Sequence, residues 1–182
     1  VITGTSRNDV IQALDGDDIV RALAGDDIVS GGADNDILIG GIGKDRLTGN
    51  TGNDDFRGTA DADVLIGGPG AERFNYDNIA HSTADPAGRD FIANFAGAGS
   101  PGGDRIDLAG IDANASVGGN QAFTFIGTSG FTGLGQVKVR SPGTYTLIEA
   151  NTTGSRAPDF GIRVDDGGGV VAGDWVAGDF IL

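Results

Sequence analysis

The sequence has 182 residues, 34 of them glycine, and its 12 basic and 26 acidic side chains give a formal net charge of −14 at pH 7. So acidic a chain lacks the clustered lysine and arginine side chains that bind nucleic acid or anionic membrane surfaces, which excludes both as partners. Cysteine is absent, which excludes disulfide bonds and thiolate metal sites, and no apolar run approaches the ~18 residues of a membrane span.

From Gly4 to Asn75 the sequence repeats without a gap, with a period of nine residues. The sixth position of each repeat is acidic, and the eighth position is apolar. A fixed internal period of this kind is typical of a solenoid, in which each repeat packs on its neighbours. The eight repeats are GTSRNDVIQ, ALDGDDIVR, ALAGDDIVS, GGADNDILI, GGIGKDRLT, GNTGNDDFR, GTADADVLI and GGPGAERFN.

The spacing within each repeat predicts a turn followed by a short strand. Six residues rich in glycine and aspartate favour a tight turn, since glycine permits positive φ, and the last three favour a strand. Two repeats then complete one coil of about 18 residues. The predicted fold is therefore all-β, a right-handed parallel β-roll. Its core is expected to consist of two apolar ladders, Ile11, Val29, Leu47 and Leu65 on one side and Val20, Leu38, Phe56 and Phe74 on the other.

Stacking of the coils brings the acidic sixth positions of alternate repeats close together, where like charges repel without a counter-ion. Calcium takes about six to eight oxygen ligands in flexible geometry, whereas magnesium demands near-ideal octahedral geometry. We therefore predict about six Ca²⁺ ions between successive turns; the alternative is that the acidic turns are merely solvated. The predicted carboxylate ligands are Asp9, Asp18, Asp27, Asp36, Asp45, Asp54, Asp63 and Glu72. Backbone carbonyl ligands are expected near Gly16, Gly25, Gly31, Gly32, Gly40, Gly41, Gly43, Gly49, Gly52 and Gly58.

This pattern resembles the RTX repeat, GGxGxDxUx, which implies a calcium-binding β-roll. The resemblance covers residues 4–75 and is interrupted at a few positions. We expect the sites that use repeats two to seven to be more regular than those that use the first or last repeat. The departures are Arg7, Asp34 and Asp61 at the fourth position, Ala13 and Ala22 at the first, and Glu72 at the sixth.

After Asn75 the period ends, and alternating apolar and polar residues predict separate strands with glycine-rich turns between them. We expect two domains, the roll over residues 1–75 and a β-rich cap with a secretion segment over residues 76–182. The cap should cover the strand edges at the open end of the roll. The predicted strands span residues 89–95, 104–108, 121–126, 136–139, 144–149 and 160–164.

Several segments of this half, among them RDFIANF (89–95), DRIDLAGID (104–112) and APDFGIRV (157–164), resemble the C-terminal domain of serralysin-type metalloproteases. Related halves occur in alginate epimerase repeat modules. The last four residues, Asp179-Phe-Ile-Leu182, resemble the uncleaved C-terminal signal that a type I secretion machine, an ABC transporter, reads; the alternative is an ordinary closing strand. The resemblance implies a protein secreted to the exterior or the cell surface of a Gram-negative bacterium. Because the chain opens at Val1 and lacks methionine, we expect it to be part of a longer gene product.

No catalytic constellation is expected in this chain. His81 is the only histidine, so an HExxH zinc site cannot be built, and no GxSxG nucleophile elbow is present. The preferred function is calcium-dependent folding and type I secretion of an extracellular protein. Two alternatives remain open: the tail of a serralysin-like zinc metalloprotease, and a module that binds anionic polysaccharide. The second would use a partly basic groove formed by Lys138, Arg140, Arg156 and Arg163.

Overall fold

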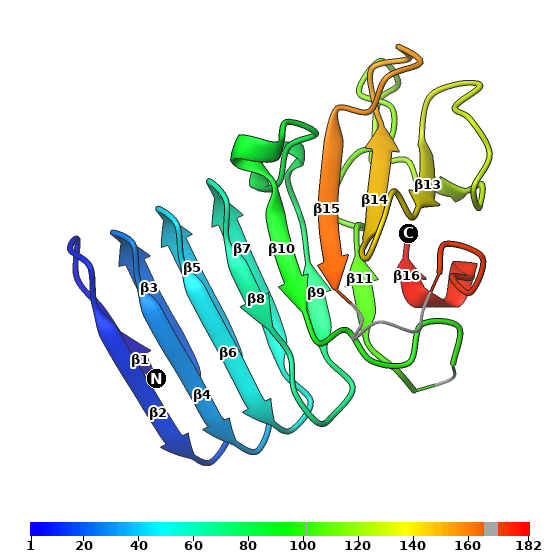
Figure 1. The fold of residues 1–182 in the computed structure, drawn as a ribbon. Helices are drawn as coiled ribbons and strands as arrows, with labels where there is room; N and C mark the ends of the chain where they lie inside the picture. Colours follow the sequence, from blue (N-terminus) through cyan, green and yellow to red (C-terminus); the bar gives the residue numbers. More distant parts are fainter. Residues whose placement is uncertain (101, 166–170) are drawn as a thin grey trace.

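A computed structural model describes residues 1–100, 102–165 and 171–182. In these residues the helical structure is limited to short 3-10 turns, η1 (Ile79–His81), η2 (Pro86–Gly88) and η3 (Ala177–Asp179). No helix in this part of the chain is long and apolar enough to cross a membrane. The architecture is all-β, as predicted (Figure 1).

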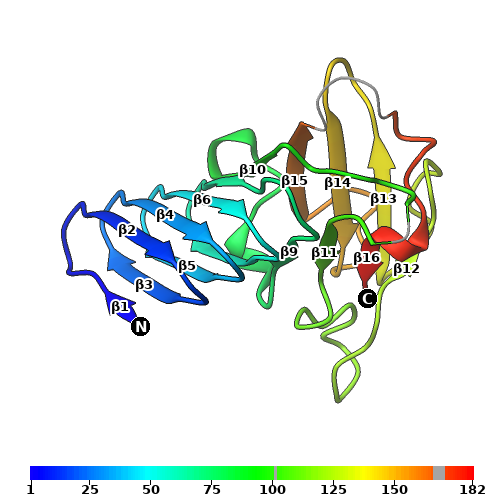
Figure 2. The same cartoon turned by 90° about the horizontal axis from the view of Figure 1, so that it is seen from below.

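The described strands form two sheets, and consecutive strands from β1 to β11 alternate between them (Figure 2). In spatial order, the first sheet consists of β1 (Ile2–Thr3), β3 (Ile19–Ala24), β5 (Ile37–Ile42), β7 (Asp55–Ala60), β9 (Arg73–Asn75), β11 (Arg105–Asp107) and β16 (Phe180–Ile181). The second consists of β12 (Thr124–Phe125), β13 (Gln136–Arg140), β14 (Thr146–Asn151), β15 (Phe160–Asp165), β10 (Asp90–Ala93), β8 (Val64–Ile66), β6 (Arg46–Thr51), β4 (Ile28–Ala33) and β2 (Val10–Asp15). The repeats therefore wind as a parallel β-roll.

The two predicted apolar ladders form the core of the roll. Strands within each sheet pair in parallel with a shift of 18 residues, so that Val20 lies opposite Leu38 and Val29 lies opposite Leu47. All members of the ladders are buried except Ile11, which is half-buried. Ile11 is less covered because β2 is the last strand of its sheet.

The strands are longer and the turns shorter than predicted. Strand β2, for example, joins the last three residues of the first repeat to the first three of the second, which leaves three residues for the turn. In repeats two to seven the prediction of a six-residue turn was wrong because residues at the start of a repeat also pair with the next coil, which satisfies their backbone polar groups. In the first and last repeats the six residues before β2 and β9 lie outside the strands, as predicted. The second position accommodates the bend with a positive φ, 80° at Leu14 and 128° at Gly32.

Both sheets continue past residue 75. Strand β10 pairs in parallel with β8, which places Ile92 opposite Leu65, and β11 pairs in parallel with β9, which places Ile106 opposite Phe74. Strand β16 then ends the first sheet, while β12 to β15 extend the second. The C-terminal half thus pairs with edges that β8 and β9 would otherwise expose. Each of the six predicted segments overlaps with a strand. The division into domains at residue 75 stays a prediction.

A row of aromatic side chains runs from the roll into the C-terminal half. Phe74 stacks on Phe56 with ring centroids 5.0 Å apart and lies 6.0 Å from Phe95. Phe95 in turn stacks on Trp175 at 4.8 Å, and Trp175 lies 5.7 Å from Phe180 in the terminal strand. The core of the repeats is therefore continuous with the packing around the C-terminus.

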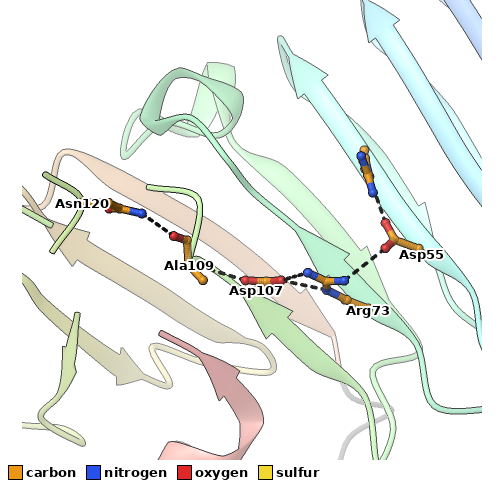
Figure 3. Close-up of polar contacts among 6 residues, drawn as sticks. Asp55, Arg73, Asp107, Ala109 and Asn120 are labelled. Atoms are coloured by element: carbon orange, nitrogen blue, oxygen red, sulfur yellow. Dashed lines mark hydrogen bonds and ion pairs between the residues drawn. The ribbon is translucent and has the colours of Figure 1, made fainter. Parts of the chain in front are cut away.

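Polar contacts join the same two parts on the outer face of the first sheet (Figure 3). Arg73 on β9 lies 3.6 Å from Asp55 on β7 and also pairs with Asp107 on β11. The Asp107 carboxylate accepts a hydrogen bond from the backbone N–H of Ala109, whose carbonyl accepts one of 2.7 Å from Asn120. These contacts fix the loop after β11 against the roll.

Candidate calcium sites

In repeats three to seven the acidic sixth position closes a three-residue turn and precedes a strand. Its Oδ1 atom accepts a hydrogen bond from the backbone N–H of the residue 18 positions earlier, as Asp27 does from Asp9 at 2.7 Å. The same bond of 2.9 Å recurs along both edges of the roll, with Asp36, Asp45, Asp54 and Asp63 as acceptors. The carboxylates therefore stack in two rows, as the nine-residue spacing predicts.

The second oxygen of these carboxylates has no hydrogen-bond partner. Oδ2 is buried and unsatisfied in five successive aspartates, and both carboxylate oxygens of Glu72 are buried and unsatisfied as well. Burying a carboxylate oxygen without a partner is costly unless a cation lies beside it. The five aspartates are Asp27, Asp36, Asp45, Asp54 and Asp63.

Glycine at the first position of a repeat makes room for these oxygens. A Cβ atom at Gly31 would overlap with Oδ2 of Asp36, and one at Gly40 would overlap with Oδ2 of Asp45. Gly49 and Gly58 have the same relation to Asp54 and Asp63, respectively. These four glycines, predicted to lie near the ions, thus lie directly against the carboxylates.

The other predicted glycines lie at two sites of close backbone approach. Gly16, Gly25, Gly43 and Gly52 are in the turns with positive φ. A Cβ at Gly43 would overlap with the carbonyl oxygen of Gly25 in the preceding coil. Gly32 and Gly41 lie in strands, where a Cβ would overlap with the carbonyl oxygens of Leu14 and Leu23. Carbonyl oxygens of one coil therefore lie close to the next coil at both sites.

Burial makes the ionised form of these acids unfavourable. Burial raises the pKa of Asp45 to about 6. Burial and the charge of Asp90 together raise the pKa of Asp63 to about 9. Burial and the neighbouring Asp104 also raise the pKa of Glu72. A bound divalent cation would favour the ionised carboxylates and so reverse this effect.

The arrangement fits a hard cation that takes oxygen ligands. Buried unsatisfied carboxylate oxygens and closely approaching carbonyl oxygens are the ligand types that calcium prefers. Among the described residues, no three His, Cys, Asp or Glu side chains converge on one point. A site between two turns must therefore take much of its coordination from backbone carbonyls.

The first coil differs from the others. Oδ2 of Asp9 accepts hydrogen bonds from the backbone N–H and the hydroxyl of Thr5, at 2.6 and 2.9 Å. Asp18 lies 3.9 Å from the terminal amino group of Val1. Both carboxylates are only half-buried, so this end of the roll offers a less desolvated site than the interior coils.

Two residues beyond the repeats continue the rows of carboxylates. Asp90 accepts a 2.9 Å bond from the backbone N–H of Asp63, and Asp104 accepts one of 2.9 Å from that of Glu72. Oδ2 of Asp90 is buried and unsatisfied. Burial raises the pKa of Asp90 to about 8, although the backbone N–H of Asp63 and the neighbouring Tyr76 hydroxyl act in the opposite direction. Oδ2 of Asp104 instead accepts a bond from Ala96. Neither was predicted from the sequence, although each begins an Asp-x-apolar triplet like the one at positions six to eight of every aspartate-containing repeat.

The predicted basic groove of the C-terminal half does not form as a free basic surface. Lys138 and Arg140 both pair with the buried Glu149, at 3.4 and 3.0 Å. This pairing lowers the pKa of Glu149, although burial acts in the opposite direction. Arg156 is exposed, and Arg163 lies on the neighbouring strand β15. Two of the four predicted residues therefore share one carboxylate, which offsets one of their two positive charges.

Comparison with known proteins agrees with this geometry. The family model of the RTX calcium-binding nonapeptide repeat matches residues 3–38 and 39–71. The solution structure of the AlgE6R3 subunit of an Azotobacter vinelandii mannuronan C5-epimerase is similar, with a TM-score of 0.59 and 23% identity over 91% of this chain and 78% of that chain. The AlgE6R2 subunit gives a TM-score of 0.57 and 24% identity over 100% of this chain and 91% of that one.

At these identities the two structures show a common fold alone. A search of curated proteins finds no match. The family match, together with the buried rows of carboxylates, assigns the repeats to metal binding rather than catalysis. Residues 3–71 therefore consist of RTX calcium-binding nonapeptide repeats, and this part of the chain is a calcium-binding parallel β-roll.

Proposed function

We propose that this chain is the calcium-dependent folding and secretion module of an extracellular bacterial protein. The observation that carries the proposal is the row of buried carboxylate oxygens without hydrogen-bond partners. In the unfolded chain water solvates these oxygens, whereas folding removes them from water. Calcium would supply the missing positive charge, and a ligand that binds only the folded state stabilises it by RT ln(1 + [L]/Kd) for each site.

The sixth-position acids of the repeats, Asp9 to Glu72, are the carboxylates that would hold the ions. Pairing each repeat with the repeat after next gives about six sites, with carbonyl oxygens of the turns completing the coordination. We place one further site between Asp63 and Asp90, because Asp90 presents the same unsatisfied Oδ2. Asp104 offers no such oxygen, since both of its oxygens accept backbone hydrogen bonds.

Calcium dependence would couple folding to export. Extracellular calcium modules bind with Kd of about 10⁻⁴ to 10⁻³ M, so at much lower calcium the repelling aspartates keep the chain unfolded and able to pass through a transporter. At millimolar calcium outside the cell the roll folds. The proposed location is the exterior or the cell surface of a Gram-negative bacterium.

The terminal segment Asp179–Leu182 is proposed to be the signal for the type I machinery, an ABC transporter. In the folded chain the Asp179 carboxylate accepts bonds of 2.7 Å from the backbone N–H groups of Gly99 and Val176, and Phe180 is buried. A transporter would therefore read this segment from the unfolded chain. The burial of Phe180 and the hydrogen bonds of Asp179 in the folded chain support an order of events in which export precedes folding.

Far-UV circular dichroism during a calcium titration that starts from EDTA tests the proposal. We expect a cooperative gain of β signal near millimolar calcium and none with magnesium at the same concentration, because magnesium is poorly suited to carbonyl-rich sites. A full β spectrum in EDTA at neutral pH would contradict it. Finding HExxH upstream in the full-length gene would assign the chain to the tail of a serralysin-like protease.

Binding of an anionic polysaccharide is a second candidate function. The observation that favours it is the similarity to subunits of an enzyme named as a mannuronan epimerase. The groove predicted from sequence is not the place for it, because Lys138 and Arg140 both donate to the buried Glu149 rather than to solvent. Any such site must therefore use arginines that do not pair with Glu149.

A further inference from the structure

A pocket of about 220 Å³ opens on the outer face of the second sheet, where β10 and β15 lie side by side. In β10 the buried Asp90 and Ile92 alternate with the half-buried Phe91, so Phe91 lies on the opposite face from Asp90. The carboxylate of Asp90 belongs to the calcium row on the inner side. The lining residues are Pro86, Arg89, Asp90, Phe91, Tyr145 and Arg163.

Two aromatic rings hold the guanidinium group of Arg163. Its Cζ lies 4.9 Å from the ring centroid of Phe91 and 4.5 Å from that of Tyr145. Phe91 is the direct cross-strand neighbour of Arg163, so the contact is built into the strand register. Stacking occupies the faces of the guanidinium group and leaves its N–H edge available for an acceptor in the plane.

Arg89 is fixed beside it by different contacts. Its Nη2 donates a hydrogen bond to the carbonyl oxygen of Ala84. Its Nε is buried and has no hydrogen-bond partner. Gly161 on β15 makes room for this group, since a Cβ there would lie 3.2 Å from Nε. A buried guanidinium donor without an acceptor is an incomplete polar site.

Neither arginine has an anionic partner within the described residues, although the chain carries a net charge of −14. Among the described residues three arginines pair with a carboxylate, Arg57 with Asp55, Arg73 with Asp107 and Arg140 with Glu149. Arg89 and Arg163 belong to the larger group of arginines that do not, and they are the two of that group that line this pocket. Two adjacent unpaired guanidinium groups in so acidic a protein indicate a site for an anion from outside the chain.

We propose that this pocket binds the carboxylate of a single acidic sugar unit within a polysaccharide. A planar carboxylate matches the fork of N–H donors of a guanidinium group. The rings of Phe91 and Tyr145 with Pro86 offer apolar surface to the C–H face of a sugar ring. The volume is below the roughly 300 Å³ at which drug-sized ligand pockets begin, so it accepts one sugar unit. The inference rests on the second candidate function, binding of an anionic polysaccharide, and names the residues that would bind it and the class of sugar unit that they would bind.

Isothermal titration calorimetry of the calcium-saturated chain with a galacturonate trisaccharide tests this proposal. Arg163→Gln and Arg89→Gln should each weaken binding by about tenfold or more, because each removes charged hydrogen bonds to the carboxylate. Arg156→Gln is the matched control, since it removes an equal charge from an exposed arginine outside the pocket. It should leave the affinity unchanged. Circular dichroism checks that each variant folds with calcium. If Arg89→Gln does not fold, Arg163→Gln still tests the proposal, because the Arg163 side chain is exposed.

Two further ligands identify the group that is recognised. The methyl ester of the trisaccharide has no charge and should not bind, and a triaspartate peptide should bind more weakly because it lacks the sugar ring. Equal affinity for triaspartate, or equal affinity of the wild-type chain and both pocket variants for the trisaccharide, would overturn the proposal. These measurements use folded, calcium-loaded protein, so they fail or succeed independently of the calcium titration that tests folding.

Discussion

The two oxygens of a sixth-position aspartate have different surroundings. In Asp45 one oxygen is bound by the backbone N–H of Asp27, while the other is buried against Gly40 without a partner. The N–H of Asp45 in turn donates to Asp63. An interior aspartate therefore contacts both the coil before it and the coil after it, whereas Asp9 has no coil before it.

Replacing an interior aspartate should therefore disable more sites than replacing the first one. We expect Asp45→Ala or Asp36→Ala to bind about two fewer calcium ions per chain, and Asp9→Ala about one fewer, because an interior turn is shared by two sites. Equilibrium dialysis with calcium measures the stoichiometry. Equal losses in all three variants would rule out the stacked-turn arrangement.

The glycine at the first position of a repeat should matter through its size. Gly40→Val places a branched side chain where Oδ2 of Asp45 lies, and overpacking of about 1–3 kcal/mol should raise the calcium midpoint of folding about tenfold. Gly40→Ala should have a smaller effect, since Ala22 occupies the equivalent position beside Asp27. Gly130→Val is the control, because a Cβ at Gly130 meets no atom within 4 Å. Calcium titrations followed by circular dichroism compare the three.

At the scale of elements, β10 and β11 decide where the roll ends. Each follows a segment longer than a repeat, so Asp90 is bonded to a residue 27 positions earlier and Asp104 to one 32 positions earlier. Both strands nevertheless present an apolar residue to the ladder, Ile92 and Ile106. The sheets and the rows of carboxylates therefore continue into the C-terminal half without the nine-residue period.

Strand β10 should accordingly take part in calcium binding. We expect Asp90→Asn to lose about one calcium ion per chain, because its unsatisfied oxygen faces the turn of Asp63. Asp104→Asn should keep the stoichiometry, since both oxygens of Asp104 already accept hydrogen bonds. Calorimetric titration with calcium distinguishes the two variants. The opposite order of effects would show that the carboxylate row ends at Asp63.

At the scale of the whole molecule, buried acids make the calcium-free fold depend on pH. In the folded chain the pKa values of Asp45, Asp90 and Asp63 are raised to about 6, 8 and 9, above the ~3.9 of an aspartate in an unfolded chain. The folded state therefore binds more protons than the unfolded state between these limits. Its stability without calcium is fully present below about pH 4 and is lost as the pH rises through 6 to 9.

Acid should thus partly replace calcium. In EDTA we expect a stronger β signal at pH 5 than at pH 8. The gain on adding calcium should be larger at pH 8, because more of the carboxylates are ionised there and the ions would neutralise them. Far-UV circular dichroism at both pH values checks this. A β signal in EDTA that is stronger at pH 8 than at pH 5 would show that burial of these carboxylates is not what limits folding.

The sequence by itself determined the roll, its two ladders and the two edges on which the acids stack. A strict period of nine places like residues at like positions, so a local pattern suffices. Tertiary structure alone decided the rest. Asp90 and Asp104 join the rows only through strand pairing across segments of irregular length. Glu149 pairs with Lys138 and Arg140 only because β13 and β14 lie side by side. The arginine pocket likewise depends on the strand register that sets Phe91 beside Arg163. No regular spacing in the sequence predicts that register.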